Sequence, residues 1–182
     1  MDAVTQVPRP ANEPVRSYAP GTAERADLIT ALDDLGSVRI DLPMTIAGQE
    51  VMGGGKRFDV TQPHARRHVL GTLKHAIQTD ARSAIDAALA AAPDWRAMPF
   101  DDRAGVFLKA ADLLSGPWRA RLNAATMLGQ SKTAYQAEID SACETADFFR
   151  YNVAFMEQIY ANQPHSTKSA GFGSGSPASS TI

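Results

Sequence analysis

The sequence predicts a mainly α-helical fold with a small N-terminal β-hairpin or meander. From Thr79 to Ala161 the apolar residues recur at steps of three and four, as they do along one face of a helix. Apolar and polar residues alternate in one short region, from Val38 to Ile46. The 182 residues include 31 alanines, whereas Leu, Ile, Val and Phe together make up 36 residues. We therefore expect a thin core in which helices pack through alanine.

The charge balance and the lack of long apolar runs exclude several functional classes. The chain has 18 Lys and Arg against 20 Asp and Glu, for a net charge of -2, so it offers no basic field to a nucleic acid. No apolar run approaches the roughly 18 residues that span a membrane. The single cysteine excludes an internal disulfide and fits a reducing compartment. We therefore expect a cytoplasmic protein with no nucleic-acid or membrane partner.

The chain divides into an arm, a folded part and a tail. Residues 1–20 contain four prolines, which disfavour helix at their own and the preceding positions, so an extended arm is predicted. Residues 21–164 carry the periodic apolar patterns. Residues 165–182 are rich in Ser and Gly and have almost nothing to bury, so this tail is predicted to be disordered.

The first helix is predicted from Thr22 to Leu35, with Thr22 as N-cap and Gly36 just past the end. Short strands are predicted next, at Val38–Leu42, Met44–Ile46, Phe58–Val60 and Val69–Leu73. Gly48 and Gly53–Gly55 supply the turns between strands, and His64–His68 is predicted as a polar loop.

Three helices of moderate length are predicted after the strands, from Thr79 to Pro93, from Asp101 or Asp102 to Leu114, and from Pro117 to Gly129. Thr79 is the expected cap of the first and Pro93 its expected end. Gly116 and Pro117 close the second, since proline suits the first position of the next helix. The third is expected to pack through Trp118, Leu122 and Ala125.

The last and longest helix is predicted from Thr133 to Ala161. Its apolar stripe consists of Ile139, Ala142, Ala146, Phe149, Val153, Met156 and Tyr160. Steps of three and four are also the spacing of a coiled-coil seam, but two alanines make a weak seam. Burial of the stripe inside a larger domain is favoured over a coiled coil, and both interpretations stay open.

Few residues suggest chemistry by themselves. Cys143 lies in mid-helix beside Glu144, which suits a packed core thiol better than a reactive one. His64 and His68 could share a metal on a helix, but Pro63 and the strands around them favour a solvated loop. Gly53–Lys56 lacks the Ser or Thr of a phosphate-binding loop. Metal or thiol chemistry at these positions is the less favoured alternative.

A polar segment between the last two helices is more informative. Met127–Thr133 forms a predicted loop, and Glu138 follows on the first turns of the long helix, within Gln136–Asp140. A carboxylate there is stabilised by the helix dipole. Residues of this kind form either a solvated cap or part of a site, and the sequence pattern leaves both open.

These segments also carry a family resemblance, together with several others in the same order along the chain. They are Asn12–Val15, Phe107–Gly116, Met127–Thr133, Gln136–Asp140, Phe148–Phe155 and Gln163-Pro164. From about Asn12 to Pro164 the chain resembles the N-terminal third of the 1-pyrroline-5-carboxylate dehydrogenases (L-glutamate γ-semialdehyde dehydrogenases), which belong to the aldehyde dehydrogenase superfamily. Their combination is typical of this subfamily.

The resemblance implies a truncated dehydrogenase. The family oxidises L-glutamate γ-semialdehyde to L-glutamate with NAD, in proline degradation. Residues 21–164 would be the helical and β-hairpin part of the NAD-binding domain, an incomplete piece of the α/β aldehyde dehydrogenase fold without its Rossmann-type sheet. Glu138 matches a glutamate that lines the family's substrate pocket and meets the substrate's amino group. The catalytic cysteine, general base and NAD site have no counterpart in this sequence, so no cofactor and no activity are expected for the chain alone.

Two further expectations follow. Helix faces that pack on an absent sheet would leave the chain marginally stable and prone to association. The alternative to a dehydrogenase fragment is a non-catalytic helical interaction module. It would pair through the long C-terminal helix with itself, with a full-length dehydrogenase or with a complementing chain.

Overall fold

The computed structural model describes residues 6–164. The helices are α1 (Ala23–Ser37), α2 (Gln78–Ala97), α3 (Phe100–Ser115), α4 (Arg119–Gln130), α5 (Ala134–Ala137), the π-helical turn η1 (Glu138–Cys143) and α6 (Glu144–Ala161). The strands are β1 (Ile40–Asp41), β2 (Met44–Ile46), β3 (Gln49–Val51), β4 (Arg57–Gln62) and β5 (Ala65–Lys74). The predicted mainly helical fold with a small β part is confirmed, and the described residues form no Rossmann-type sheet.

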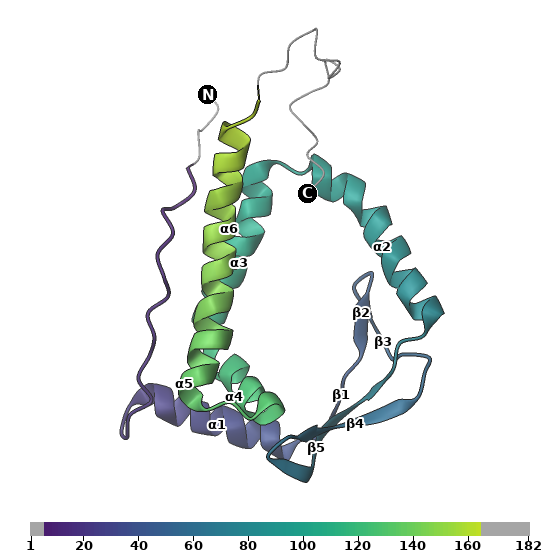
Figure 1. Cartoon of the computed structure of the whole chain (residues 1–182), viewed down its shortest axis with the longest axis vertical. Coiled ribbons are helices and arrows are strands. Elements are labelled where there is room, and N and C mark those ends of the chain that lie inside the picture. Colours follow the sequence, from purple (N-terminus) through teal and green to yellow (C-terminus); the bar gives the residue numbers. More distant parts are fainter. Residues whose placement is uncertain (1–5, 165–182) are drawn as a thin grey trace.

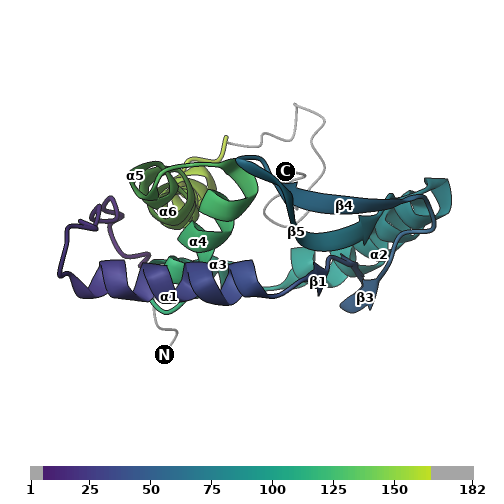
Figure 2. The ribbon, with the colours of Figure 1, turned by 90° about the horizontal axis from the view of Figure 1, so that it is seen from below.

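The core is formed by four helices. α6 lies along α3, and α1 crosses the ends of these helices and packs on α4 (Figures 1 and 2). The buried apolar residues of the described part are small, as expected from the composition: seven of the ten are alanines, at 0 to 8% exposure. The helices therefore approach closely, and little bulky apolar surface is enclosed.

The long C-terminal helix is confirmed, with one interruption. Thr133 caps it by accepting a hydrogen bond from the amide of Gln136, and the helix runs through α5, η1 and α6 to Ala161. In the predicted stripe, Ala142, Ala146 and Val153 are buried. Phe149 and Tyr160 of the stripe contact the rings of Phe107 and Phe100 of α3, so the stripe packs within the chain and does not act as a coiled-coil seam.

The first helix begins as predicted but ends later. Thr22 Oγ1 accepts the amide of Arg25 at 3.4 Å, which is the expected N-cap bond. The helix continues to Ser37, so Gly36 lies in its last turn and not beyond it. Leu28 is the buried residue of this helix, and the helix packs on α4.

The strands form two small sheets. β5 pairs antiparallel with β4 and parallel with β1, and β2 pairs antiparallel with β3. Ala47 and Gly48 join β2 to β3 with φ of 50° and 76°, the positive values of a two-residue hairpin turn. Gly48 is therefore a turn residue, as predicted.

Two predictions about the strand region are wrong. Residues 65–68 belong to β5 and not to a polar loop, because the strand extends beyond the core with both faces exposed and needs no apolar alternation. Gly53–Gly55 do not turn a hairpin: they connect β3 to β4, which lie in different sheets. They pack closely on the next segment, since a Cβ on Gly55 would lie 2.7 Å from the carbonyl oxygen of His75.

The second helix differs from its prediction at both ends. Ile77 is the N-cap in place of Thr79, and the Asp80 carboxylate accepts the amides of Ile77 and Gly54, each at 2.9 Å. Pro93 lies inside the helix and does not end it. No residue of α2 is buried, and its apolar face is open: Leu89 is 66% exposed.

The third and fourth helices follow their predicted order. α3 runs to Ser115, and Gly116 is its C-cap. α4 begins at Arg119 and not at Pro117. The predicted packing face of α4 is wrong, because it buries Arg119, Asn123, Ala124 and Thr126, whereas Trp118 is 53% exposed.

The N-terminal arm is extended. Residues 6–19 form neither helix nor strand and run alongside α6 (Figure 1). The Asp147 carboxylate of α6 accepts the Asn12 side-chain amide at 2.9 Å and the Glu13 backbone amide at 2.7 Å. The predicted Ser/Gly-rich tail, 165–182, lies outside the described residues. Across residues 6–164, no helix combines the length and the apolar character that a membrane span requires.

Candidate functional site

Glu138 is the centre of a buried polar cluster. It is the first residue of η1 and is 0% exposed. Its Oε1 accepts the Arg16 backbone amide at 2.7 Å, and its Oε2 accepts the Tyr18 hydroxyl at 2.7 Å and the Asn123 side-chain amide at 2.8 Å. The Arg119 guanidinium donates to both oxygens, through Nη2 to Oε1 and through Nε to Oε2.

Arg119 is the cationic partner in this cluster. It is 1% exposed, and its charge is met by Glu138 on one side and by Glu13 of the arm on the other. Nη2 also donates to the Pro14 carbonyl at 2.7 Å, and Nη1 to the Ser115 carbonyl at 3.2 Å. A buried charge needs this degree of compensation, because removing it from water costs several kcal/mol.

The cluster joins the arm to the helices. Glu13 of the arm bridges two arginines, since its second oxygen accepts Arg150 Nη1 of α6 at 2.6 Å. Burial would raise the pKa of the Glu13 carboxyl, but the hydrogen bonds from Arg150 and Arg119 outweigh burial and lower it. The arm is therefore held by charge and by backbone contacts, not by apolar packing alone.

The carboxylate of Glu138 stays ionised. Burial alone would raise its pKa, but the Arg119 guanidinium and the three further donors outweigh burial and lower the pKa to about 2. Burial and the hydrogen bond to the same carboxylate raise the pKa of the Tyr18 hydroxyl to about 12. Glu138 thus carries a fixed negative charge beside a neutral phenol near pH 7.

One acceptor in the cluster has no donor. Asn123 uses its side-chain amide on Glu138 and on the Tyr18 hydroxyl at 2.9 Å. Its Oδ1 is buried and receives no hydrogen bond from the described residues. A buried, unpaired carbonyl oxygen favours a donor such as a water molecule or an ammonium group.

Cys143 closes the cluster but is not activated by it. The thiol is 5% exposed and lies 3.8 Å from Glu138 Oε1 and 3.4 Å from Arg119 Nη2. Burial and the Glu138 charge raise the pKa of the Cys143 thiol to about 11. This agrees with the predicted packed thiol and not with a nucleophile.

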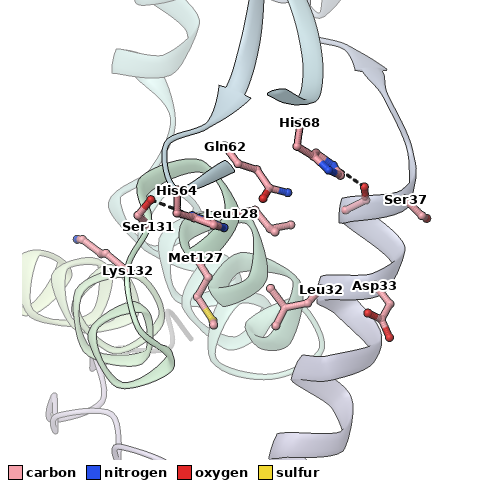
Figure 3. Close-up of a pocket in the computed structure, with 11 residues that line it drawn as sticks. Leu32, Asp33, Ser37, Gln62, His64, His68, Met127, Leu128, Ser131 and Lys132 are labelled. Carbon is pink, nitrogen blue, oxygen red and sulfur yellow. Dashed lines mark hydrogen bonds between the residues drawn. The ribbon is translucent and has the colours of Figure 1, made fainter. Parts of the chain in front are cut away.

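A second feature is an open pocket of about 780 Å³ between the end of α1, the end of α4 and the β4–β5 hairpin (Figure 3). It brings together His64 and His68, which the sequence suggested as a solvated pair. Both side chains are exposed. His64 Nδ1 lies 2.9 Å from Ser131 Oγ, and His68 Nε2 lies 2.8 Å from the Gly36 carbonyl oxygen. Within residues 6–164, no group of three metal-binding side chains converges.

Sequence reasoning found Glu138 but missed its partners. Arg119 and Asn123 lie four residues apart on one face of α4, and this helical spacing is the signal that could have found them. The arm residues Arg16 and Tyr18 carry no such signal, since their approach to Glu138 spans more than a hundred residues of sequence.

Comparison with protein families gives a match to the aldehyde dehydrogenase family over residues 51–175. The match covers more than half of the chain, and the chain therefore belongs to the aldehyde dehydrogenase family. Within it, the curated relatives are Delta-1-pyrroline-5-carboxylate dehydrogenases. That of Agaricus bisporus is 45% identical over 163 residues, which cover 89% of this chain and 30% of the relative. The human mitochondrial protein is 42% identical over 154 residues, which cover 85% of this chain and 27% of the human protein.

A solved structure gives the same relationship in three dimensions. The Delta-pyrroline-5-carboxylate dehydrogenase from Mycobacterium tuberculosis, bound with NAD and cobalamin, is 58% identical and aligns with a TM-score of 0.88 over 92% of this chain and 32% of its own. The predicted resemblance to 1-pyrroline-5-carboxylate dehydrogenases is confirmed. The chain spans about 30% of the length of the curated relatives it matches.

Proposed function

We propose that this chain is part of an NAD-dependent 1-pyrroline-5-carboxylate dehydrogenase and oxidises no aldehyde by itself. The relatives support a part of such a dehydrogenase. The proposed lack of activity is supported by Cys143, which is the single cysteine of the sequence and would have to supply the thiolate. Aldehyde oxidation through a thiohemiacetal needs a thiolate that the substrate can reach.

Cys143 meets neither requirement. With a thiol pKa of about 11, on the order of one molecule in 10⁴ carries the thiolate at pH 7. The thiol is also enclosed by the arm, since the Pro14 carbonyl lies 3.9 Å from Sγ. A reaction at this position would need the arm to leave the helices and the charge of Glu138 to be removed.

The test is NADH formation by the purified chain with NAD and L-glutamate γ-semialdehyde. The expected result is a rate equal to the rate without protein. The matched control is Cys143→Ser, which keeps the size of the side chain but has no thiol. Turnover above background that this variant loses would refute the proposed inactivity.

We further propose that Glu138 has the role implied by the family, which is to attract the substrate's amino group. The ionised carboxylate beside the unpaired Asn123 Oδ1 supports this role, because an ammonium group donates hydrogen bonds to both. Glu138 is fully covered here, so the contact requires a present donor, such as the Tyr18 hydroxyl, to move aside.

This role is tested by adding L-glutamate or glutarate, which lacks the amino group, to the chain. We expect L-glutamate alone to shift the NMR signals of the Asn123 side-chain amide. Equal shifts with both compounds, or no shift with either, would count against a site for an amino group at Glu138.

A second candidate function is a non-catalytic interaction module, with association through α6. The outer face of α6 favours it: Phe148 is 63% exposed, Phe155 50% and Ile159 48%. Each of these residues directly precedes a residue of the stripe, about 100° away around the helix. The partner would be a second copy, a full-length dehydrogenase or a complementing chain that supplies other parts of the fold.

Sedimentation of the chain, alone and with a complementing dehydrogenase fragment, separates the two candidates. Association that Phe148→Ser with Phe155→Ser abolishes, without any gain of turnover, favours the interaction module. Association that restores NADH formation favours the dehydrogenase part. We also propose that the chain is located in the cytoplasm. The human relative is named as mitochondrial, so cell fractionation is the experiment that distinguishes the two locations.

A further inference from the structure

The open pocket beside the β4–β5 hairpin is separate from the Glu138 cluster. Its walls come from the last turns of α1, from the end of α4 and from the hairpin (Figure 3). None of the side chains that contact Glu138 lines it. Its volume, about 780 Å³, lies in the range of pockets that hold small molecules.

Gln62 is the feature that points to a ligand. The residue is 7% exposed, and its side-chain amide is not among the buried polar atoms that lack a partner, so the amide borders the open space of the pocket. Figure 3 shows the amide directed into the pocket, between His64 and His68. An amide in this position offers a donor and an acceptor side by side to a molecule that enters the pocket.

The backbone around Gln62 is irregular in a way that sets this direction. The pairing of β4 with β5 shifts register on each side of Thr61, so that Gln62 pairs with Ala65. A β-bulge of this kind turns a side chain away from the direction that regular pairing gives it. The bulge thus places the Gln62 amide over the pocket.

The two histidines form fixed walls. Each uses one ring nitrogen at the end of a helix, His68 at the Gly36 carbonyl of α1 and His64 at the Ser131 hydroxyl, where Ser131 is the C-cap of α4. Their remaining ring nitrogens are open to a ligand. Because the rings are held, they define the width of the space around the Gln62 amide.

The charges around the pocket favour a neutral ligand. Two helix C-termini meet there, and their carbonyl groups disfavour anions. Asp33 adds a negative charge at the rim. The ammonium of Lys132 is engaged by Asp140, 2.8 Å away. A phosphate or carboxylate would therefore find no free side-chain cation of the Lys or Arg type among the lining residues.

The opposite wall is apolar. Leu32 of α1 and Met127 and Leu128 of α4 line it below the amide (Figure 3). Flexible thioether and aliphatic side chains pack well on the face of a flat ring. The pocket thus combines an apolar surface with one amide at its edge, which is the usual composition of a small-molecule site.

We propose that this pocket binds a small, neutral, planar heterocycle with a hydrogen-bond donor and acceptor side by side on one edge, as in an aminopurine. The Gln62 amide pairs with that edge, and the ring lies on Met127 and Leu128. A glutamine amide makes two hydrogen bonds of this kind to the adenine edge. This site goes beyond the proposed dehydrogenase role and does not depend on it.

The test uses adenosine as the probe, with purine riboside, which lacks the amino group, and adenosine 5′-monophosphate as comparisons. Dissociation constants are measured with the chain by calorimetry. We expect adenosine to bind, purine riboside to bind about tenfold or more weakly, and the monophosphate to bind no more tightly than adenosine.

Two variants complete the test. Gln62→Leu keeps the size of the side chain but has no amide, and we expect it to weaken adenosine binding about tenfold or more. Asp86→Asn, at an exposed position of α2, which contributes no lining residue, is the matched control and is expected to leave binding unchanged, with circular dichroism as the check of folding in both. No binding of adenosine at about 10 mM, equal affinity for purine riboside, or tighter binding of the monophosphate would overturn the proposal.

Discussion

At the scale of the residue, the pair of Glu138 and Arg119 governs the centre of the fold. Both side chains are enclosed, at 0% and 1% exposure, and they connect η1, α4 and the arm. Breaking a buried ion pair costs more than the pair contributes, because the remaining charge stays buried without its partner. The cluster is therefore the most sensitive point of the molecule to substitution.

We predict that Glu138→Gln lowers the free energy of unfolding by about 3–5 kcal/mol at pH 7. The variant leaves the Arg119 guanidinium with Glu13 as its remaining charged partner. Urea unfolding followed by circular dichroism measures the change. Asp140→Asn, which removes an exposed ion pair with Lys132, is the control and should cost about 1 kcal/mol or less. Equal losses for the two variants would contradict the prediction.

We also predict that stability declines in acid. The folded pKa of Glu138, about 2, lies below its ordinary value of 4.5, so the unfolded chain binds the proton first. The stabilisation is complete above pH of about 4.5 and is lost as the pH falls towards about 2. Glu13 contributes in the same direction, since its pKa is also lowered.

A series of urea unfolding curves from neutral pH to about pH 2 measures this decline. In Glu138→Gln the decline should be smaller, because one of the two responsible carboxyls is gone. A free energy of unfolding that stays constant, or rises, as the pH falls through this range would show that the cluster does not control acid stability.

At the scale of the element, backbone conformation decides where the short strands turn. The β2–β3 hairpin turns at Ala47 and Gly48, and both have positive φ. Gly48 adopts this conformation without steric cost because it has no Cβ. In Ala47 the Cβ is crowded by the neighbouring backbone, so the same conformation costs energy. The pairing of β2 with β3 fixes the type of this turn. In the sequence, only Gly48 indicated that a turn lies here.

We predict that Ala47→Asn stabilises the hairpin by about 0.5–1 kcal/mol, because Asn tolerates the left-handed region better than Ala and Asn-Gly is the preferred pair in this turn. Gly48→Ala, with φ of 76° at that position, should destabilise it by a similar amount or more. Hydrogen exchange of the Ile46 and Gln49 amides, which flank the turn, measures both. Destabilisation by Ala47→Asn, or stabilisation by Gly48→Ala, would contradict the assigned turn.

At the scale of the whole molecule, much apolar surface stays uncovered. Ile85 and Leu89 on α2 and Phe148 on α6 are each more than half exposed. α2 buries none of its residues and stands beside the strands, away from the helical core (Figure 1). Apolar faces of this size mark an interaction surface or a tendency to associate.

We predict that the chain alone melts below about 60 °C, in a broad transition, and binds the dye ANS in its native state. A partner that covers α2 and the outer face of α6 should sharpen the transition and displace the dye. Calorimetry and dye fluorescence measure both effects. A sharp, reversible melt of the monomer above about 60 °C, without dye binding, would refute the prediction of a marginal fold.

How much could be predicted differs between the elements and the site. The helices from Asp101 to Ala161 were predicted because steps of three and four, a capping threonine and a Gly-Pro pair act within one turn of chain. The prediction that Pro93 ends its helix is wrong. Proline removes one backbone hydrogen bond from the helix, and α2, which buries no residue, continues past it to Ala97. Glu138 came from the family resemblance, but its burial could not be predicted, because its partners are distant in sequence.

The helical period, the alanine-rich core, the hairpin glycine and the membership of the aldehyde dehydrogenase family can all be predicted from the order of the residues. These properties depend on neighbours within a few residues or on matched segments. The tertiary structure alone decided that α4 buries a polar face, that the arm lies along α6, and that Gln62 points into a pocket between two helix ends. Long-range contacts decide these features, because a buried charge selects its partners by distance in space and not by position along the chain.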